Sequence, residues 1–265
     1  MDLVLDVGNS GIKGGLFRGE DLLETFRVET DEKKSRGTNA IRARTQEVIQ
    51  EVLRERGGEP IRRCGILSVV PRLTAPLTET LTELLSELEE PPVRLRAEGG
   101  GPIEPGYASM DTLGVDRFAA ACGGYLRAGA GPVVVVDAGT AITTEVVDAE
   151  GRYVGGSITA GPELILRALV EHTAQLEPIS LEVPPRPIGH TTEESLRTGI
   201  LRGAVDGLEG AIRRYARELG EPTGIYLTGG WAERLSALME TAHEVHPHLV
   251  LEGGRALLNA RGEAG

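Results

Sequence analysis

The chain has 265 residues, of which 40% are hydrophobic and 26% charged, so it can bury one large core or two smaller ones. Its formal net charge of −12 disfavours nucleic-acid binding, which depends on Lys and Arg side chains that neutralise phosphates. The N-terminal segment lacks the features of a signal peptide and no apolar stretch is long enough to span a bilayer, so we expect a cytoplasmic protein.

The chain begins with three short apolar runs separated by turn residues, a pattern that predicts a three-strand meander. Residues 90–105 are rich in Pro, Gly and charge, which predicts an exposed connection. The expected elements of the first half are strands over 3–7, 12–17, 22–28 and 66–70, and helices over 40–56, 78–88 and 112–126.

The second half repeats this order. Laid in register, Asp6 matches Asp137, Gly8 matches Gly139 and Ile12 matches Ile142. Asp-x-Gly is common in turns, but the meander that follows it in both halves indicates an internal duplication. The expected elements are strands over 133–136, 142–147, 153–158 and 225–228, and helices over 162–172, 193–219 and from about 231.

The two matching strand ends carry residues suited to phosphate binding. Asp6 is placed to hold Mg²⁺, which prefers carboxylates together with substrate phosphates. The turn formed by residues 8–11 can bring backbone N–H groups to phosphate oxygens, and Lys13 adds a positive charge. The second copy, residues 137–141, would grip a nucleotide from the other side if the halves pack with pseudo-twofold symmetry. Taken in isolation, the first turn is better interpreted as an ordinary hairpin turn, and it is the pair of turns that favours a nucleotide site.

Residues 114–117, Gly-Val-Asp-Arg, open the helix that joins the halves. Asp116 can accept the proton of a substrate hydroxyl, and the planar guanidinium of Arg117 suits a carboxylate or phosphate. A first-turn carboxylate stabilised by the helix dipole is the alternative interpretation of Asp116. No Walker A motif and no GxGxxG motif after a strand is present, which argues against a P-loop or dinucleotide fold.

Two further groups of residues have a spacing that invites a function. His243, His246 and His248 could bind a metal, but no carboxylate or cysteine pattern supports a site, and a solvated helix end is the favoured interpretation. Cys64 and Cys122 lack CxxC spacing, and reduced, buried thiols are favoured over a disulfide.

Taken together in order and spacing, these motifs resemble the type III pantothenate kinase family over nearly the full chain. Val115, Thr144, Glu145, Thr191 and His246 depart from the family's commonest residues. The matching blocks are D-x-G-N-[ST] at 6–10, G-[AV]-D-R at 114–117, D-x-G-T-A at 137–141, VVD-x-x-G-x-Y-x-GG at 146–156, I-G-x-x-T at 188–192 and TGG at 228–230.

The resemblance implies an α/β protein made of two duplicated ribonuclease-H-like domains, an actin/hexokinase-type ATPase fold with a cleft between residues 1–115 and residues 116–265. It implies ATP-dependent phosphorylation of pantothenate, the first step of coenzyme A biosynthesis, by a homodimer. The implied cofactors are Mg²⁺ and a monovalent cation, K⁺ or NH₄⁺.

The resemblance also implies residue roles. Asp116 would be the general base, Asp6 would hold Mg²⁺ and Asp137 the monovalent cation. The ATP phosphates would contact Asp6, Val7, Gly8, Asn9, Ser10, Gly11, Ile12, Lys13 and Thr140. Pantothenate would contact Tyr107, Gly114, Val115, Asp116, Arg117 and, across the dimer interface, Thr192. The alternatives are a kinase or phosphohydrolase for another small substrate, and a nucleotide-binding regulatory or accessory protein of the same fold.

Overall fold

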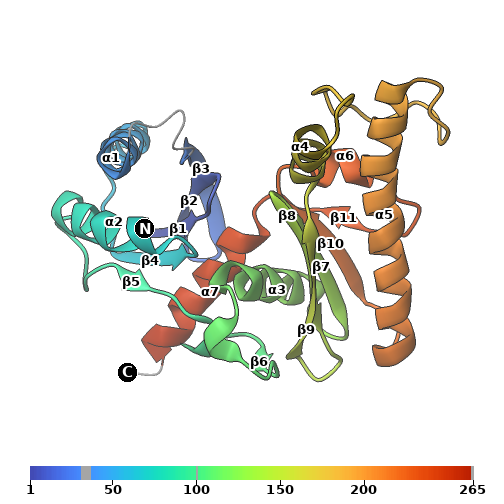
Figure 1. Ribbon diagram of the computed structural model, residues 1–265. Helices are drawn as coiled ribbons and strands as arrows, with labels where there is room; N and C mark the ends of the chain where they lie inside the picture. The colour runs from blue at the N-terminus through green and yellow to red at the C-terminus, as the bar shows by residue number, and fades with distance from the viewer. Residues whose placement is uncertain (31–36, 100, 264–265) are drawn as a thin grey trace. The chain divides into compact units, whose positions relative to one another are not determined.

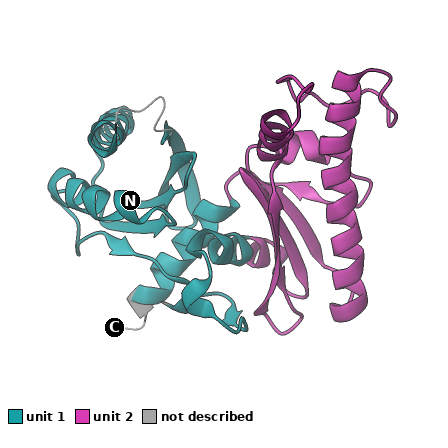
Figure 2. Cartoon of the chain, viewed as in Figure 1, with its two compact units in different colours: residues 1–123, 249–265 teal, residues 124–248 magenta. Residues whose placement is uncertain are grey.

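The computed structural model describes residues 1–30, 37–99 and 101–263, and the chain divides into two compact units (Figures 1 and 2). Unit 1 comprises Met1–Gly123 and Leu249–Gly265, and unit 2 comprises Gly124–His248. The domain limits expected from the sequence, 1–115 and 116–265, stay a prediction. The compact units differ from them because residues 116–123 and the C-terminal segment both belong with unit 1.

Unit 1 is built on one mixed sheet. Its strands are β1 (Asp2–Val7), β2 (Gly11–Arg18), β3 (Asp21–Glu29), β4 (Arg63–Ser68) and β5 (Val93–Arg94), in the order β3-β2-β1-β4-β5. The first three strands form the expected antiparallel meander, whereas β4 runs parallel to β1 and β5 parallel to β4.

Strand β1 is buried on both faces, since Leu3, Val4 and Leu5 are all fully buried. Leu3 and Leu5 pack in one cluster with the buried side chains of α1 (Thr38–Glu55) and α2 (Pro71–Leu84). On the opposite face, a methyl group added at Gly254 of α7 (Leu249–Glu263) would come within 2.8 Å of Val4 Cγ1. A strand covered on both faces needs a continuous apolar run, as this one has.

Unit 2 repeats the same arrangement. Its strands lie in the order β11-β10-β7-β8-β9, with β7, β8 and β9 antiparallel and β10 and β11 parallel to β7. The elements are β7 (Val133–Ala138), β8 (Ala141–Val147), β9 (Arg152–Ala160), α4 (Pro162–His172), α5 (Thr192–Leu219), β10 (Gly224–Thr228), α6 (Ala232–Ser236) and β11 (Glu244–Val245). Identical strand order and direction in the two units confirm the duplication.

Three sequence predictions need correction. Helix α2 begins at Pro71 rather than at residue 78, because proline is tolerated at the first helical position, where its missing N–H has no partner in the helix. Helix α7 has no counterpart among the predicted elements (Figure 1). Residues 90–105 are not simply an exposed connection, since they contain β5, the 3₁₀ turn η1 (Ala97–Gly99) and β6 (Glu104–Pro105), and Leu95 and Ile103 are buried.

The helix joining the two halves is α3 (Val115–Ala128), close to its predicted position. Both cysteines are buried free thiols, as expected. Burial raises the pKa of the Cys64 thiol to about 12 and also raises the pKa of Cys122, so neither forms a thiolate readily. None of the described helices combines the length and apolar character needed to cross a membrane.

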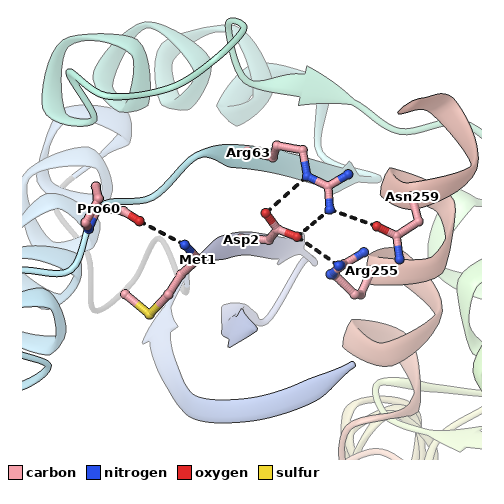
Figure 3. A network of polar contacts seen from close by, with 6 residues as sticks. All are labelled: Met1, Asp2, Pro60, Arg63, Arg255 and Asn259. Carbon is pink, nitrogen blue, oxygen red and sulfur yellow. Dashed lines mark hydrogen bonds and ion pairs between the residues drawn. The ribbon is translucent and has the colours of Figure 1, made fainter. Parts of the chain in front are cut away.

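A buried charge cluster fastens α7 to the sheet of unit 1 (Figure 3). The Asp2 carboxylate accepts hydrogen bonds from Arg63 Nε at 3.1 Å and Arg63 Nη2 at 2.6 Å, and it lies 3.0 Å from Arg255 Nη2. Arg63 also donates to Asn259 Oδ1 at 2.8 Å. The hydrogen bond to Asp2 raises the pKa of Arg63, whereas burial lowers the pKa of Arg255. One carboxylate therefore compensates two guanidinium groups.

Replacing this carboxylate should destabilise unit 1 strongly. Asp2→Asn leaves the buried Arg255 without its counter-charge, and removing one partner of such a pair costs about 3–5 kcal/mol. The measurement is urea denaturation followed by far-UV circular dichroism. The control is Glu87→Gln, which removes the partner of Arg62 in an exposed ion pair and should cost less than about 1 kcal/mol. Equal effects of the two substitutions would contradict a structural role for the cluster.

Candidate active site

The first phosphate-binding candidate is the turn between β1 and β2. Gly8 N–H donates to the Gly11 carbonyl at 3.0 Å, and Asn9 and Ser10 at the tip are exposed. Asp6 lies opposite Lys13 in the β1–β2 register, so their side chains lie on the same face of the sheet. This end of the hairpin therefore places a carboxylate, an ammonium group and an exposed turn close together.

Two predicted phosphate contacts can act only through the backbone. The side chains of Val7 and Ile12 are fully buried in the core of unit 1. Any contact of these residues with a phosphate would use their main-chain groups, which fits a site that cradles anions with backbone N–H donors.

The Thr30 hydroxyl hydrogen-bonds to the backbone of the first turn, a contact that was not predicted from the sequence. Its hydroxyl lies 2.9 Å from the Asn9 carbonyl and 3.2 Å from the Gly8 carbonyl, and the residue is buried. Thr30 follows the end of β3, and nothing in its local sequence points to a turn 21 residues earlier. The contact exists only because the meander folds back on itself.

The second candidate turn, between β7 and β8, is closed by an equivalent backbone hydrogen bond. The loop that this bond closes is one residue shorter than in the first turn. Gly139 N–H donates to the Ala141 carbonyl at 2.9 Å, and Thr140 at the tip is exposed. Gly161 N–H donates to the Thr140 carbonyl at 2.9 Å, and a methyl group on Gly161 would collide with that backbone. Glycine at position 161 is thus required for the close approach of the two segments.

Asp137 is flanked by threonine side chains from both neighbouring strands. It lies opposite Thr143 in β8 and opposite Thr228 in β10, so the three side chains share one face of the sheet. The hydroxyl oxygens of Thr143 and Thr228 are buried and, among the described residues, have no hydrogen-bond partner. A methyl group on Gly229, which has a φ of +93°, would collide with Asp137 Oδ1, so the turn after β10 packs directly on this carboxylate.

This donor set fits a monovalent cation. One carboxylate with two neutral hydroxyls is an all-oxygen environment with a single negative charge. The described residues contain no group of three or more His, Cys, Asp or Glu side chains arranged for a metal ion. A divalent ion such as Mg²⁺ would therefore need oxygens from a bound phosphate in addition to the protein.

Asp116 occupies the first turn of α3. Its Oδ1 accepts a hydrogen bond from the Arg117 backbone N–H at 2.8 Å. Burial raises the pKa of the Asp116 carboxyl, against the opposing effects of backbone hydrogen bonds and the Arg117 charge. A carboxylate with a raised pKa is a stronger base than an ordinary aspartate, which suits proton abstraction.

Gly114 makes room for this carboxylate. A methyl group at position 114 would come within 2.5 Å of Asp116 Oδ1, so any side chain there would displace the predicted base. The Gly114 carbonyl also accepts the first helical hydrogen bond, from Phe118 N–H at 3.2 Å. The Gly-Val-Asp-Arg spacing is thus explained by local geometry as well as by helix initiation.

A cavity of about 460 Å³ lies beside Gly114 and Val115 in unit 1. Its lining also includes Ser68 at the end of β4, and Ser68 pairs with Val7 at the end of β1. The cavity therefore lies at the carboxyl ends of the neighbouring strands β1 and β4, where the first turn also begins. Open α/β sheets bind ligands outside the carboxyl ends of their strands. Gly114 and Val115 line the cavity directly before Asp116 in the chain, whereas Asp116 and Arg117 are not among its lining residues.

The other predicted contacts are placed as follows. Tyr107 is 36% exposed on the segment after β6, and Arg117 is half-buried beside Asp116. Thr192, the first residue of α5, is exposed in unit 2, whereas the other predicted pantothenate contacts lie in unit 1. A second cavity, of about 470 Å³ along α5, is lined by none of the predicted site residues.

Two of the positions that depart from the family pattern, Thr144 and Glu145, are buried in the interior of unit 2. Glu145 and Tyr153 are fully buried, with Tyr153 Oη donating to Glu145 Oε2 at 2.6 Å. The Thr144 hydroxyl lies 2.8 Å from Ser157 Oγ and 3.1 Å from Tyr215 Oη. Thr191 caps α5 by accepting a hydrogen bond from Glu194 N–H.

The histidine cluster makes local contacts. His243 Nε2 lies 2.7 Å from Ser236 Oγ, and His246 Nε2 lies 3.1 Å from Glu244 Oε2. His243 and His246 flank the short strand β11 and do not end a helix, so the prediction is wrong for them, whereas His248 directly precedes α7 and does lie at a helix end. Short loop and strand segments carry little periodicity in the sequence, which explains the error.

Solved structures with low sequence identity share this fold. A protein of Campylobacter jejuni described as a Baf family transcriptional activator superposes with a TM-score of 0.58 at 18% identity, covering 98% of this chain and 99% of that one. Component A of the (R)-2-hydroxyglutaryl-CoA dehydratase of Acidaminococcus fermentans has a TM-score of 0.57 at 14% identity, covering 99% and 98%. Together with the repeated sheet order, these matches confirm two duplicated domains of the actin/hexokinase-type ATPase fold.

Sequence comparisons are more specific. A type III pantothenate kinase of Thermomicrobium roseum is 34% identical over 257 residues, covering 97% of this chain and 96% of that protein. The enzyme of that name from Myxococcus xanthus is 32% identical over 259 residues, covering 97% of each chain. Residues 2–214 match the family described as type III pantothenate kinase. The chain therefore belongs to the type III pantothenate kinase family.

Proposed function

We propose that this chain transfers the γ-phosphoryl group of ATP to the primary hydroxyl of pantothenate, forming 4′-phosphopantothenate for coenzyme A biosynthesis. The observation that carries the proposal is the half-buried Asp116 with its raised pKa, beside a cavity at the sheet edge, in a chain of this family. ATP and a divalent metal follow from membership of a kinase family. The presence of free thiols and the need for ATP support a cytoplasmic location.

In this proposal Asp116 accepts the proton of the attacking hydroxyl. The first turn contributes backbone N–H groups and the Lys13 ammonium to the phosphates, and Thr140 contacts the nucleotide from the second turn. Asp6 would hold Mg²⁺, which would supply positive charge against the negative charge of the transferring group. Phosphoryl transfer depends mainly on positioning and electrostatics, which is what these side chains and backbone groups provide.

Asp116→Asn should lower kcat about 10²–10⁴-fold, because a positioned general base typically contributes that much. The kcat/KM of the wild-type protein should fall on the acid side as Asp116 becomes protonated, at a pH above the usual carboxyl range because its pKa is raised. A coupled ATP assay with pantothenate measures both effects.

The matched control is Asp206→Asn on the exposed face of α5, which should keep wild-type kinetics. Wild-type turnover by Asp116→Asn would contradict the assignment. Phosphate release without phosphopantothenate would instead favour a phosphohydrolase. Nucleotide binding without any turnover would favour the regulatory alternative.

We infer that Asp137, with the hydroxyls of Thr143 and Thr228, holds a monovalent cation, K⁺ or NH₄⁺, that supports ATP binding. The two buried, unpartnered hydroxyls flanking the carboxylate support this assignment. The cation would offset negative charge near the second turn, which matters in a chain with a net charge of −12.

Replacing K⁺ by tetramethylammonium should weaken Mg·ATP binding at least about fivefold, the lower range of typical coupling between two ligands. Asp137→Asn should bind ATP weakly and lose this dependence on K⁺, whereas Glu150→Gln in the exposed turn after β8 should keep it. Isothermal titration calorimetry provides the readout. ATP affinity that is insensitive to K⁺ in the wild-type protein would exclude the proposed site.

We also infer a homodimer in which Thr192 reaches the pantothenate site of the partner subunit. Large apolar side chains are exposed in unit 2, with Ile158 at 63% and Ile188 at 71%, and exposed apolar surface commonly marks an interface. Ile188 lies close to Thr192 in the sequence.

Sedimentation equilibrium should give about twice the chain mass of 28.2 kDa. Ile158→Asp should shift the protein toward the monomer and raise the KM for pantothenate. Thr192→Ala should raise that KM and leave the mass unchanged. A wild-type monomer with full activity would rule the arrangement out.

A further inference from the structure

The cavity of unit 1 is lined in part by charged side chains to which the predicted site assigns no role. Besides Gly114 and Val115 it is lined by Arg94 and Arg96, which come from the segment misjudged as an exposed connection. Neither guanidinium group has a hydrogen bond or an ion pair with any residue that the structure describes. Two positive charges therefore border the cavity without compensation by a direct contact.

The backbone beneath these arginines is fixed. Leu95, between them, is 2% exposed, and its N–H donates to the Ile66 carbonyl at 2.9 Å. Leu95 packs so closely on β4 that a methyl group at Gly65 would come within 2.9 Å of Leu95 Cδ1. Arg94 and Arg96, on either side of the buried Leu95, both line the cavity.

The cavity lining also contains negatively charged side chains that can accept hydrogen bonds from a substrate. Glu98 and Asp111 also line the cavity and offer carboxylate acceptors. Pantothenate carries one carboxylate, two hydroxyls and one amide N–H, so it presents one anion and three donors. A cavity with two cations and two anionic acceptors matches that set of groups. Its volume, about 460 Å³, is in the range of small-molecule sites.

The direction of the substrate follows from chemistry. The carboxylate of pantothenate lies at the opposite end of the molecule from the primary hydroxyl that attacks ATP. With the hydroxyl at Asp116, the carboxylate must lie away from the start of α3. Arg94 and Arg96 line the cavity that Gly114 and Val115 also line, and a guanidinium group binds a carboxylate in a fixed, forked geometry.

We propose that Arg94 and Arg96 bind the substrate carboxylate and thereby make the enzyme selective for acidic substrates. This inference rests on the proposed function and adds a specificity element to it. Arg117, beside Asp116, is then left to the reacting end of the substrate.

The test compares pantothenate with pantothenol, the neutral alcohol that keeps the primary hydroxyl and lacks the carboxylate. In the Arg94→Gln/Arg96→Gln double variant, the KM for pantothenate should rise about ten- to hundredfold, as expected for lost hydrogen bonds to a charged group. The KM for pantothenol and kcat for both substrates should stay near the wild-type values. Calorimetric binding of the two ligands without ATP should show the same difference.

The matched control is Arg44→Gln/Arg54→Gln on the exposed side of α1, which removes the same charge from unit 1 and should change neither KM. An unchanged preference for pantothenate in the Arg94→Gln/Arg96→Gln variant would overturn the inference while leaving the proposed function intact. An equal rise in KM for both substrates would also overturn it, because a general structural effect does not distinguish the carboxylate. A wild-type protein that phosphorylates neither compound would refute the proposed function instead.

Discussion

Each unit is organised around a strand that is buried on both faces and ends in a carboxylate. Burying a charged carboxylate without partners is costly, so the aspartate has to lie where the apolar run stops and the chain turns. Asp6 at the end of β1 and Asp137 near the end of β7 satisfy this constraint in the same way. Both are followed by a glycine whose N–H closes the turn. The position of the proposed nucleotide-binding groups is thus a consequence of how each core is built.

The acidic character of the chain limits how it can bind a polyphosphate. With a net charge of −12, the average field repels anions, so binding must use backbone N–H groups, a few local cations and metal ions. In the proposed site, the exposed turns after β1 and β7 would provide the backbone groups, and Lys13 would provide one cation. In the same way, Arg94 and Arg96 would provide local positive charge for the carboxylate of the substrate.

Much of the fold could be predicted because local patterns and tertiary structure agree. The two apolar runs that end in Asp-x-Gly, and the meanders after them, identified the duplication and both turns. Other features depend on distant contacts that leave no local signal. Helix α7 contains Gly253 and Gly254, which lower helix propensity, yet these glycines allow α7 to pack closely on Ala119 and Val4.

The site shows the same division. Motifs in the sequence predict roles for Asp6, Asp116 and Asp137, because each lies in a short block of turn or helix-start residues, and these roles stay predictions. Thr30 was missed because it supports the first turn through a hydrogen bond across the meander. The position of Arg94 and Arg96 beside a cavity could not be predicted, because Leu95 is a single buried residue in a segment dominated by Pro, Gly and charge.

A crystal structure with Mg²⁺, a non-hydrolysable ATP analogue and pantothenate would test the central claim most directly. The account predicts the phosphates at the turn after Asp6, and the primary hydroxyl of pantothenate within about 3 Å of an Asp116 carboxylate oxygen. Phosphates bound away from both glycine turns, or a pantothenate hydroxyl remote from Asp116, would contradict it.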